Sequence, residues 1–276
     1  MLLSLFLALI GEPKVDVDVV YSKVAGEELK MDIHSPAAAT SPLPATVVIH
    51  GGAWMSGNRK DMSGNANELA KRGIVAATIS YRLAPKHKWP GMVDDVQTAV
   101  RFLRANAAKY NIDPTRIGAT GASAGGHLAL FLGVTDTLDK KATEYPGFSS
   151  KVKAVLNIFG PTDLTDRTDF PAPIAGMLSL QVFGKKLEEA TELAKMASPI
   201  FLVTKDDAPV FILQGLTDKL VNPHQSRILE AKLKEVGVRC ESAYVEDMGH
   251  EVPMEKPQVK AAMERAVAWF IAELKK

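Results

Sequence analysis

Three residues of the chain supply, in sequence order, the side chains that nucleophilic acyl transfer requires. Ser123 lies at the centre of Gly-Ala-Ser-Ala-Gly (residues 121–125), which fits the pattern Gly-x-Ser-x-Gly. Asp218 and His250 follow it, each directly after an apolar segment. A serine hydroxyl attacks a carbonyl group when a histidine takes its proton and a carboxylate orients that histidine. We therefore predict Ser123 as nucleophile, Asp218 as acid and His250 as base.

The residues around Ser123 predict a sharp turn between a strand and a helix. Residues 116–120 are typical of a short buried strand, and residues 126–132 of a helix with an apolar face. Such a turn exposes the hydroxyl and leaves room only for very small neighbours. The outer neighbours here are glycine and the inner ones alanine. The alternative interpretation, a Gly-rich loop that only packs a helix on a sheet, is not excluded by this pattern alone.

Strands and helices alternate along most of the chain, which predicts an α/β fold. Two alternating segments, 15–21 and 29–33, indicate an antiparallel pair. Residues 45–50 are typical of a fully buried parallel strand, and further strands are predicted at 74–79, 116–120, 152–159, 211–214 and 241–245. We expect a mostly parallel central sheet with helices on both faces. We also expect residues 1–276 to form a single domain.

One connection is longer than a crossover between strands needs. It runs from the strand ending near Phe159 to the strand starting near Pro209. We predict that residues 161–207 form a small cap over the C-terminal edge of the sheet, where open α/β sheets bind ligands. Most apolar residues of this cap are expected in the core and a minority in a pocket. The residues predicted to line the substrate pocket are Trp54, Phe170, Met177 and Phe183.

The acid and the base are both expected at the sheet edge that carries Ser123. Asp218 and His250 come directly after predicted strands, and parallel strands end at a common edge. Asp163, which follows the strand before the cap, is a second candidate for orienting His250. His127 lies on the helix that follows Ser123, and we expect it to be a buried packing histidine with satisfied hydrogen bonds.

A loop of small residues follows an earlier buried strand. It has the sequence His-Gly-Gly-Ala-Trp, residues 50–54. Backbone amides in such a loop can stabilise the negative charge that develops on a substrate oxygen. We select the amides of Gly52 and Ala53, together with that of Ala124, as the oxyanion hole. The alternative is an ordinary Gly-rich turn. The presence of this loop and the Ser123 turn in the same chain disfavours that alternative.

Charge and composition disfavour several classes of function. The chain has 33 Lys and Arg against 32 Asp and Glu, without a long run of either sign. Binding to nucleic acid or to an anionic membrane surface is therefore not expected. The six histidines are scattered, and none has a second ligand at helical spacing, so we expect no metal site and no cofactor. The single cysteine, Cys240, excludes an internal disulfide.

An apolar segment lies within residues 1–14 and has two interpretations. It is too short to span a bilayer, so no membrane span is expected. It resembles the core of a secretory signal, but no basic residue precedes it and no clear cleavage site follows. The second interpretation is a helix that packs on the protein or beside the active site. The compartment, cytoplasmic or secreted, and the oligomeric state therefore stay open.

The set of motifs resembles that of α/β-hydrolases of the hormone-sensitive-lipase and carboxylesterase-like group. Besides the loop at 50–54 and the turn at Ser123, two further features match: Tyr-Arg-Leu-Ala-Pro at 81–85, and an Asp-Asp pair at 94–95 that opens a helix. The resemblance covers nearly the whole chain from Val15. It implies the order nucleophile, acid, histidine that was assigned above.

Two departures from the group's pattern bear on the prediction. The loop reads His-Gly-Gly-Ala rather than His-Gly-Gly-Gly, which leaves the choice of oxyanion amides open. The chain before His50 is nearly filled by two predicted strands, so the large N-terminal cap of many relatives does not fit. The resemblance is therefore stronger to small esterases with an open site, including xylan-deacetylating and feruloyl-type members.

The resemblance implies a serine carboxylesterase that hydrolyses short acyl esters through an acyl-enzyme, without a cofactor. The expected partner is a small ester substrate, and acylated carbohydrates are among the candidates. One alternative is an amidase, such as an arylformamidase-like enzyme with its His-Gly-Gly-x-Trp loop, or a peptidase of the same fold. Another alternative is a non-catalytic binding protein that has kept the hydrolase fold.

Overall fold

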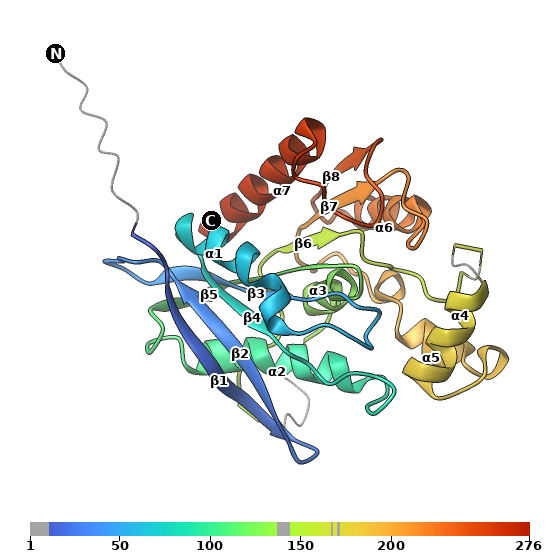
Figure 1. Ribbon diagram of the computed structural model, residues 1–276, viewed down its shortest axis with the longest axis horizontal. Helices are drawn as coiled ribbons and strands as arrows, with labels where there is room; N and C mark the ends of the chain where they lie inside the picture. The colour runs from blue at the N-terminus through green and yellow to red at the C-terminus, as the bar shows by residue number, and fades with distance from the viewer. Residues whose placement is uncertain (1–10, 137–143, 167, 170–171) are drawn as a thin grey trace.

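Eight strands form one sheet in the computed structural model, which describes residues 11–136, 144–166, 168–169 and 172–276 (Figure 1). Their order across the sheet is β1-β2-β4-β3-β5-β6-β7-β8. The strands are β1 (Lys14–Val24), β2 (Glu27–Ser35), β3 (Leu43–Ile49), β4 (Val75–Ile79), β5 (Ile112–Ala122), β6 (Val155–Ile158), β7 (Val210–Gly215) and β8 (Cys240–Val245).

Parallel pairing dominates the sheet. β1 and β2 form an antiparallel hairpin, and β2 also pairs antiparallel with β4. All the pairs from β4 through β3, β5, β6 and β7 to β8 are parallel. The predicted fold class, a mostly parallel sheet in an α/β-hydrolase arrangement, is confirmed. The carboxyl ends of the strands that carry the candidate residues therefore lie along one edge.

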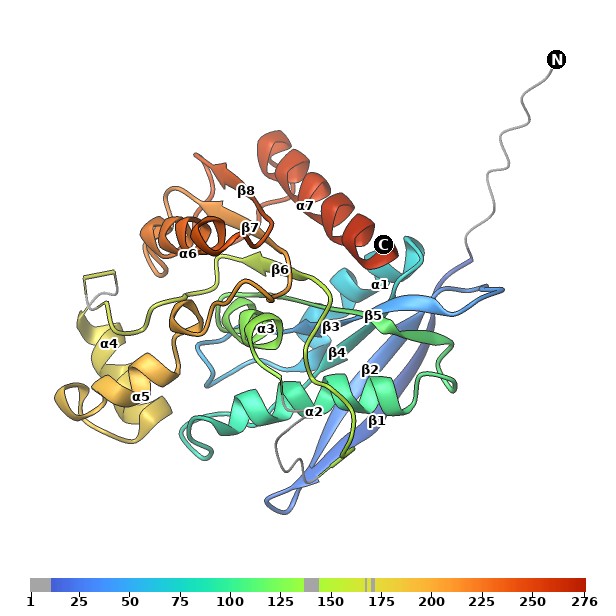
Figure 2. The ribbon, with the colours of Figure 1, turned by 180° about the vertical axis from the view of Figure 1, so that it is seen from behind.

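Helices cover both faces of the sheet (Figures 1 and 2). Alternate residues of a strand point to opposite faces, and β3 follows this rule: Val47 and Ile49 join one core and Val48 the other. α2 and α3 contribute to the first core, and α1 and α7 to the second. The helices of the two layers are α1 (Ser63–Lys71), α2 (Gly91–Ala105), α3 (Ala124–Val134), α6 (Pro223–Val236) and α7 (Pro257–Lys275), with the short η1 (Arg59–Met62) before α1.

The connection between β6 and β7 contains a group of short helices, here called the cap segment (residues 161–207). Helices this short are marginal in isolation, so contacts with the sheet domain must hold them. The amide of Trp89 donates to the carbonyl of Val182 at 3.0 Å, and Lys88 Nζ donates to the carbonyl of Gln181 at 2.7 Å. The helices are α4 (Ala172–Leu178), the π-helix η2 (Ser179–Phe183), η3 (Leu187–Glu189), α5 (Thr191–Met196) and η4 (Pro199–Phe201).

α4 and α5 lie together at the end of the molecule away from β1 and β2 (Figure 1). The apolar residues 1–10 and the predicted pocket residue Phe170 lie outside the described residues. Within the part of the chain that the structure describes, none of the helices has the length and apolar character that crossing a bilayer requires.

Candidate active site

Ser123, Asp218 and His250 meet at the edge of the sheet where β5, β7 and β8 end. His250 Nε2 lies 2.8 Å from Ser123 Oγ. His250 Nδ1 lies 2.7 Å from Asp218 Oδ2. The structure therefore brings the three predicted residues together in the hydrogen-bonded order that serine acyl transfer uses.

Ser123 occupies a strained turn between β5 and α3. Its backbone has φ 57° and ψ −124°, a left-handed conformation that is unfavourable for residues other than glycine. A Cβ atom on Gly125 would lie 2.1 Å from the carbonyl oxygen of Ile49, and one on Gly121 would lie 2.5 Å from the backbone of Gly125. Any side chain at these positions would therefore push the turn away from β3. This contact explains why the sequence has glycine on both sides of the serine.

Asp218 is held by donors on both of its carboxylate oxygens. The amides of Leu220 and Val221 each donate to Oδ1 at 2.9 Å. Oδ2 faces His250 and also accepts a longer hydrogen bond, 3.4 Å, from Gln214 Nε2. The residue is only 5% exposed. The two backbone donors fix the plane of the carboxylate, and this places Oδ2 against the imidazole.

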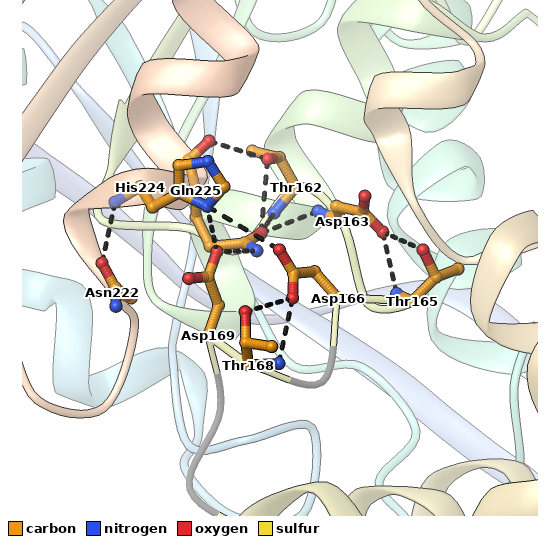
Figure 3. Close-up of polar contacts among 9 residues, drawn as sticks. All are labelled: Thr162, Asp163, Thr165, Asp166, Thr168, Asp169, Asn222, His224 and Gln225. Carbon is orange, nitrogen blue, oxygen red and sulfur yellow. Dashed lines mark hydrogen bonds and ion pairs between the residues drawn. The ribbon is translucent and has the colours of Figure 1, made fainter.

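Asp163, the second candidate acid, lies in a different network. Its Oδ1 accepts hydrogen bonds from the amide and the hydroxyl of Thr165, at 2.8 and 2.6 Å (Figure 3). Its own amide donates to Gln225 Oε1 at 2.7 Å. Among the described residues, no hydrogen bond or ion pair joins Asp163 to His250. The geometry therefore favours Asp218 over Asp163 as the partner of the histidine.

Two residues that sequence reasoning missed hold His250 in position. The amide and the hydroxyl of Thr217 both donate to the carbonyl of Met248, at 3.1 and 2.9 Å, and this ties the histidine loop to the acid loop. The ring of Phe159 lies 4.6 Å, centroid to centroid, from that of His250. Their residue types do not predict this role. The available clue in the sequence is their position, because Thr217 precedes Asp218 and Phe159 directly follows a strand end.

The loop at 50–54 lies beside Ser123, since a Cβ atom on Gly51 would be 3.4 Å from Ser123 Cβ. Gly52, Ala53 and Trp54 have positive φ values of 102°, 52° and 60°. A Cβ atom on Gly52 would lie 2.2 Å from the carbonyl oxygen of Ser56. The amides of Gly52, Ala53 and Ala124 have no hydrogen-bond acceptor among the described residues.

His50 and Tyr81 support this loop from behind. Their rings stack with centroids 4.3 Å apart and an interplanar angle of 12°. The Tyr81 hydroxyl donates to the carbonyl of His50 at 3.1 Å, and His50 Nδ1 lies 2.8 Å from the carbonyl of Gly51. Burial lowers the pKa of His50 and raises that of Tyr81. Both side chains are therefore neutral groups that fix the loop through hydrogen bonds rather than charge.

An apolar cavity of about 100 Å³ lies between this loop and the cap segment. Of the predicted pocket residues, Trp54 and Phe183 line it. Met177 is not part of the lining and is 39% exposed. His127 also lines the cavity and is fully buried, with hydrogen bonds at both ring nitrogens. The prediction that His127 is a satisfied buried histidine is confirmed.

Comparison with known proteins identifies the family. Residues 31–233, about three quarters of the chain, match the model of the BD-FAE family. The chain belongs to the BD-FAE family. It is 35% identical over 211 residues to "Esterase LipC" of Mycobacterium tuberculosis, an alignment that covers 75% of this chain and 52% of LipC. The BD-FAE chain thus spans about half the length of the curated relatives it matches.

Solved structures resemble this BD-FAE chain over nearly its full length. A truncated form of a carbohydrate esterase from gut microbiota has a TM-score of 0.84 and 29% identity, covering 98% of this chain and 99% of that one. The esterase Est2 of Thermogutta terrifontis, with butyrate bound, has a TM-score of 0.77 and 26% identity, covering 94% and 95%. The predicted resemblance to carboxylesterase-like α/β-hydrolases is confirmed.

A second polar cluster of the BD-FAE chain joins the cap segment to the start of α6 (Figure 3). Asp166, Asp169 and His224 each place one potential ligand atom within 4.8 Å of the others, a set that could coordinate a metal ion. His224 Nδ1 lies 2.8 Å from Asp169 Oδ2, which also accepts a 2.8 Å hydrogen bond from Gln225 Nε2. The sequence predicted no metal-ligand cluster. Periodicity could not reveal this one because 55 positions separate Asp169 from His224.

Proposed function

We propose that this protein is a carboxylic ester hydrolase with Ser123, His250 and Asp218 as its catalytic triad. The observation that carries the proposal is the continuous pair of hydrogen bonds, 2.8 Å from Ser123 Oγ to His250 Nε2 and 2.7 Å from His250 Nδ1 to Asp218 Oδ2. Membership of the BD-FAE family and the similarity to esterases support the same reaction class.

The reaction begins with attack of Ser123 Oγ on the ester carbonyl carbon. His250 Nε2 takes the serine proton, and Asp218 Oδ2 holds the hydrogen on Nδ1, which leaves Nε2 as the accepting atom. His250 then gives the proton to the departing alcohol, and the acyl group stays on Ser123. Water, activated by His250 in the same way, attacks the acyl-enzyme and releases the acid.

The oxyanion formed at each attack accepts hydrogen bonds from the amides of Gly52, Ala53 and Ala124. The amides of Gly52 and Ala53 belong to a loop that is already held in place by His50 and Tyr81, and the amide of Ala124 begins α3. Donors fixed before the reaction cost no reorganisation at the transition state, and one such donor is typically worth roughly 3–4 kcal/mol.

We further propose that the preferred substrates carry short acyl groups, from acetyl to butyryl. The cavity of about 100 Å³ is smaller than an engineered apolar cavity of about 150 Å³ that holds benzene in another protein. Butyrate, the acid bound to the similar Est2, has an acyl chain of this size. The resemblance to a carbohydrate esterase supports acylated carbohydrates as the substrate class.

Hydrolysis of p-nitrophenyl acetate tests the proposal directly. We expect turnover by the wild-type protein that is lost in Ser123→Ala, and much slower cleavage of the corresponding p-nitroanilide. Faster cleavage of the anilide would favour the amidase alternative. Absence of turnover of both compounds, with butyrate still bound, would favour a binding protein with the hydrolase fold.

A further inference from the structure

His127 lies where three segments meet beside the nucleophile. It is one turn after Ser123 on α3, and its amide donates to the carbonyl of Ser123 at 3.0 Å. Its ring makes an edge contact with Trp54 of the 50–54 loop, with centroids 4.9 Å apart, and lies 5.8 Å from the ring of Trp89. Its Nε2 is 2.7 Å from the carbonyl of Ala197 in the cap segment. One side chain thus joins the nucleophile's helix, the oxyanion loop and the cap.

The hydrogen bonds of His127 select one neutral form of the ring. The indole N–H of Trp54 is only a donor, so His127 Nδ1 must accept the 3.3 Å hydrogen bond between them. Nε2 therefore carries the hydrogen and donates to Ala197 O. Burial also lowers the pKa of His127 to about 4. Near neutral pH the ring presents an uncharged surface with no free polar atom.

The rest of the described cavity wall is mostly apolar and carries no charge. None of the described residues that line it is an Asp, Glu, Lys or Arg. Three of the described lining residues, Thr165, Ser179 and Thr191, carry hydroxyls. The hydroxyl of Ser179 donates to Lys185 O at 2.7 Å and that of Thr165 to Asp163 Oδ1 at 2.6 Å, so two of the three already donate hydrogen bonds. An apolar ligand group in this cavity gains van der Waals contact, whereas a charged group loses its hydration and finds no opposite charge.

Two residues of the cavity wall are also close in the chain to residues of the proposed catalytic site. Trp54 directly follows Ala53 of the proposed oxyanion hole, and four residues of helix place His127 about 6 Å beyond Ser123 along α3. An acyl carbonyl bound between Ser123 and the oxyanion amides therefore has the cavity, with His127 on its wall, as the adjoining apolar space.

We propose that this cavity is the acyl-binding site, and that His127 is the wall residue that limits the length of the acyl chain. The inference rests on the proposed esterase function and adds to it a specificity-determining residue. The site takes unbranched aliphatic acyl groups from acetyl to butyryl. It disfavours acyl groups with a terminal carboxylate, because the described wall has no cationic side chain to pair with that charge.

Replacing His127 by alanine tests the wall. We expect His127→Ala to move the maximum of kcat/KM from butyrate to hexanoate or octanoate in a p-nitrophenyl ester series, with roughly a fourfold gain for each methylene that finds new apolar wall. The matched control is His34→Ala. His34 is also buried, bonds Asn67 at 2.7 Å from β2 and does not line the cavity. The His34→Ala variant should have a lower free energy of unfolding and an unchanged acyl-length profile.

Filling the cavity tests the same inference in the opposite direction and does not depend on the hydrogen bonds of His127. Ala175 lines the cavity and is 9% exposed. We expect Ala175→Leu to lower the ratio of butyrate to acetate turnover severalfold. In the wild type, the p-nitrophenyl monoester of succinic acid should be hydrolysed at least roughly tenfold less well than the butyrate ester, which has a chain of equal length.

Binding to the Ser123→Ala variant separates this inference from the proposed function. Sodium butyrate and sodium octanoate can be titrated against tryptophan fluorescence, because Trp54 and Trp89 line the cavity. We expect butyrate to bind more tightly than octanoate, and a His127→Ala exchange in the same background to reverse the order. If wild type hydrolyses no ester but this reversal is found, the esterase proposal fails and the cavity assignment stands. Identical acyl-length and binding profiles in wild type, His127→Ala and Ala175→Leu would overturn the assignment.

Discussion

His250 Nε2 and Ser123 Oγ lie 2.8 Å apart, although 127 positions separate the two residues in the chain. They come from β5 and β8, which are not neighbours, since β6 and β7 lie between them in the sheet. The loop that carries His250 must therefore reach back across two strands. The hydrogen bonds from Thr217 to the carbonyl of Met248 hold it there. The contact therefore depends on how the strands from β5 to β8 are placed along this edge of the sheet.

Ser123→Ala should abolish ester hydrolysis and leave the fold intact. Alanine is as compatible as serine with the φ of 57° at this turn, and it removes only the Oγ atom that His250 contacts. The rate of p-nitrophenyl acetate hydrolysis and the thermal unfolding midpoint measure the two effects. A well-folded variant with activity near that of the wild type would rule out Ser123 as the nucleophile.

Asp218→Asn should lower kcat by orders of magnitude, on the order of 10⁴ in a comparable triad, because an amide stabilises the wrong histidine tautomer. Asp163→Asn should have a small effect, since an asparagine oxygen can still accept the hydrogen bonds from Thr165. The comparison needs kcat for both variants under the same conditions. A severe loss in Asp163→Asn together with a mild one in Asp218→Asn would require the acid to be reassigned.

Gly52→Ala should lower kcat by roughly 10²–10³ by displacing an oxyanion donor. The new Cβ would lie 2.2 Å from Ser56 O, at a residue with φ 102°. Gly64→Ala is the matched control, because a Cβ there meets no atom within 4 Å and the residue lies in α1. The control should keep full activity and gain up to about 1 kcal/mol in free energy of unfolding. Equal activity of the two variants would exclude the 50–54 loop from the oxyanion hole.

The fold and the three central residues of the site could be predicted because both depend on local patterns. Alternation of apolar residues locates a strand and its two faces, as Val47, Val48 and Ile49 show in β3. Ser123, Asp218 and His250 each directly follow such a segment, and parallel strands bring their ends to one edge. Chain order and residue type were then sufficient to pair them.

The remaining features depend on the paths of loops, which periodicity does not describe. Met177 was predicted in the pocket, but it is exposed, because the turn of α4 determines which of its apolar residues face inward. The contact of Phe159 with His250 and the gathering of Asp166, Asp169 and His224 join segments that are distant in the sequence. No spacing rule connects such residues before the fold is known.

The wild-type chain should hydrolyse acetyl to butyryl esters far better than decanoyl esters. Each methylene that finds apolar wall contributes about 0.8 kcal/mol, so selectivity should reverse where the cavity ends. We expect the same maximum in a form that lacks residues 1–10, if that segment does not extend the wall. The measurement is kcat/KM for p-nitrophenyl esters from acetate to dodecanoate on both forms. A maximum at octanoate or longer in both forms would contradict the short-chain proposal.

Protonation of His127 should make the protein less stable in acid. Burial lowers the pKa of His127 from 6.5 to about 4 in the folded state. Between these values the unfolded chain binds a proton and the folded protein does not, so the free energy of unfolding rises with pH. The contribution of neutral His127 to the free energy of unfolding is fully present above the pKa that His127 has in the unfolded chain. It is lost as the pH falls toward the pKa of His127 in the folded protein. The whole difference amounts to about 3 kcal/mol.

His127→Phe should remove this part of the pH dependence. The phenyl ring keeps an aromatic group at the cavity wall but cannot titrate, and it leaves Trp54 Nε1 and Ala197 O without their partner. The variant should therefore be less stable at pH 7 and should lose less stability than the wild type between pH 7 and pH 4.5. Urea unfolding at both pH values measures the difference. His50 titrates in both proteins and cancels in the comparison. An equal loss in wild type and variant would show that His127 does not stay neutral in the folded protein.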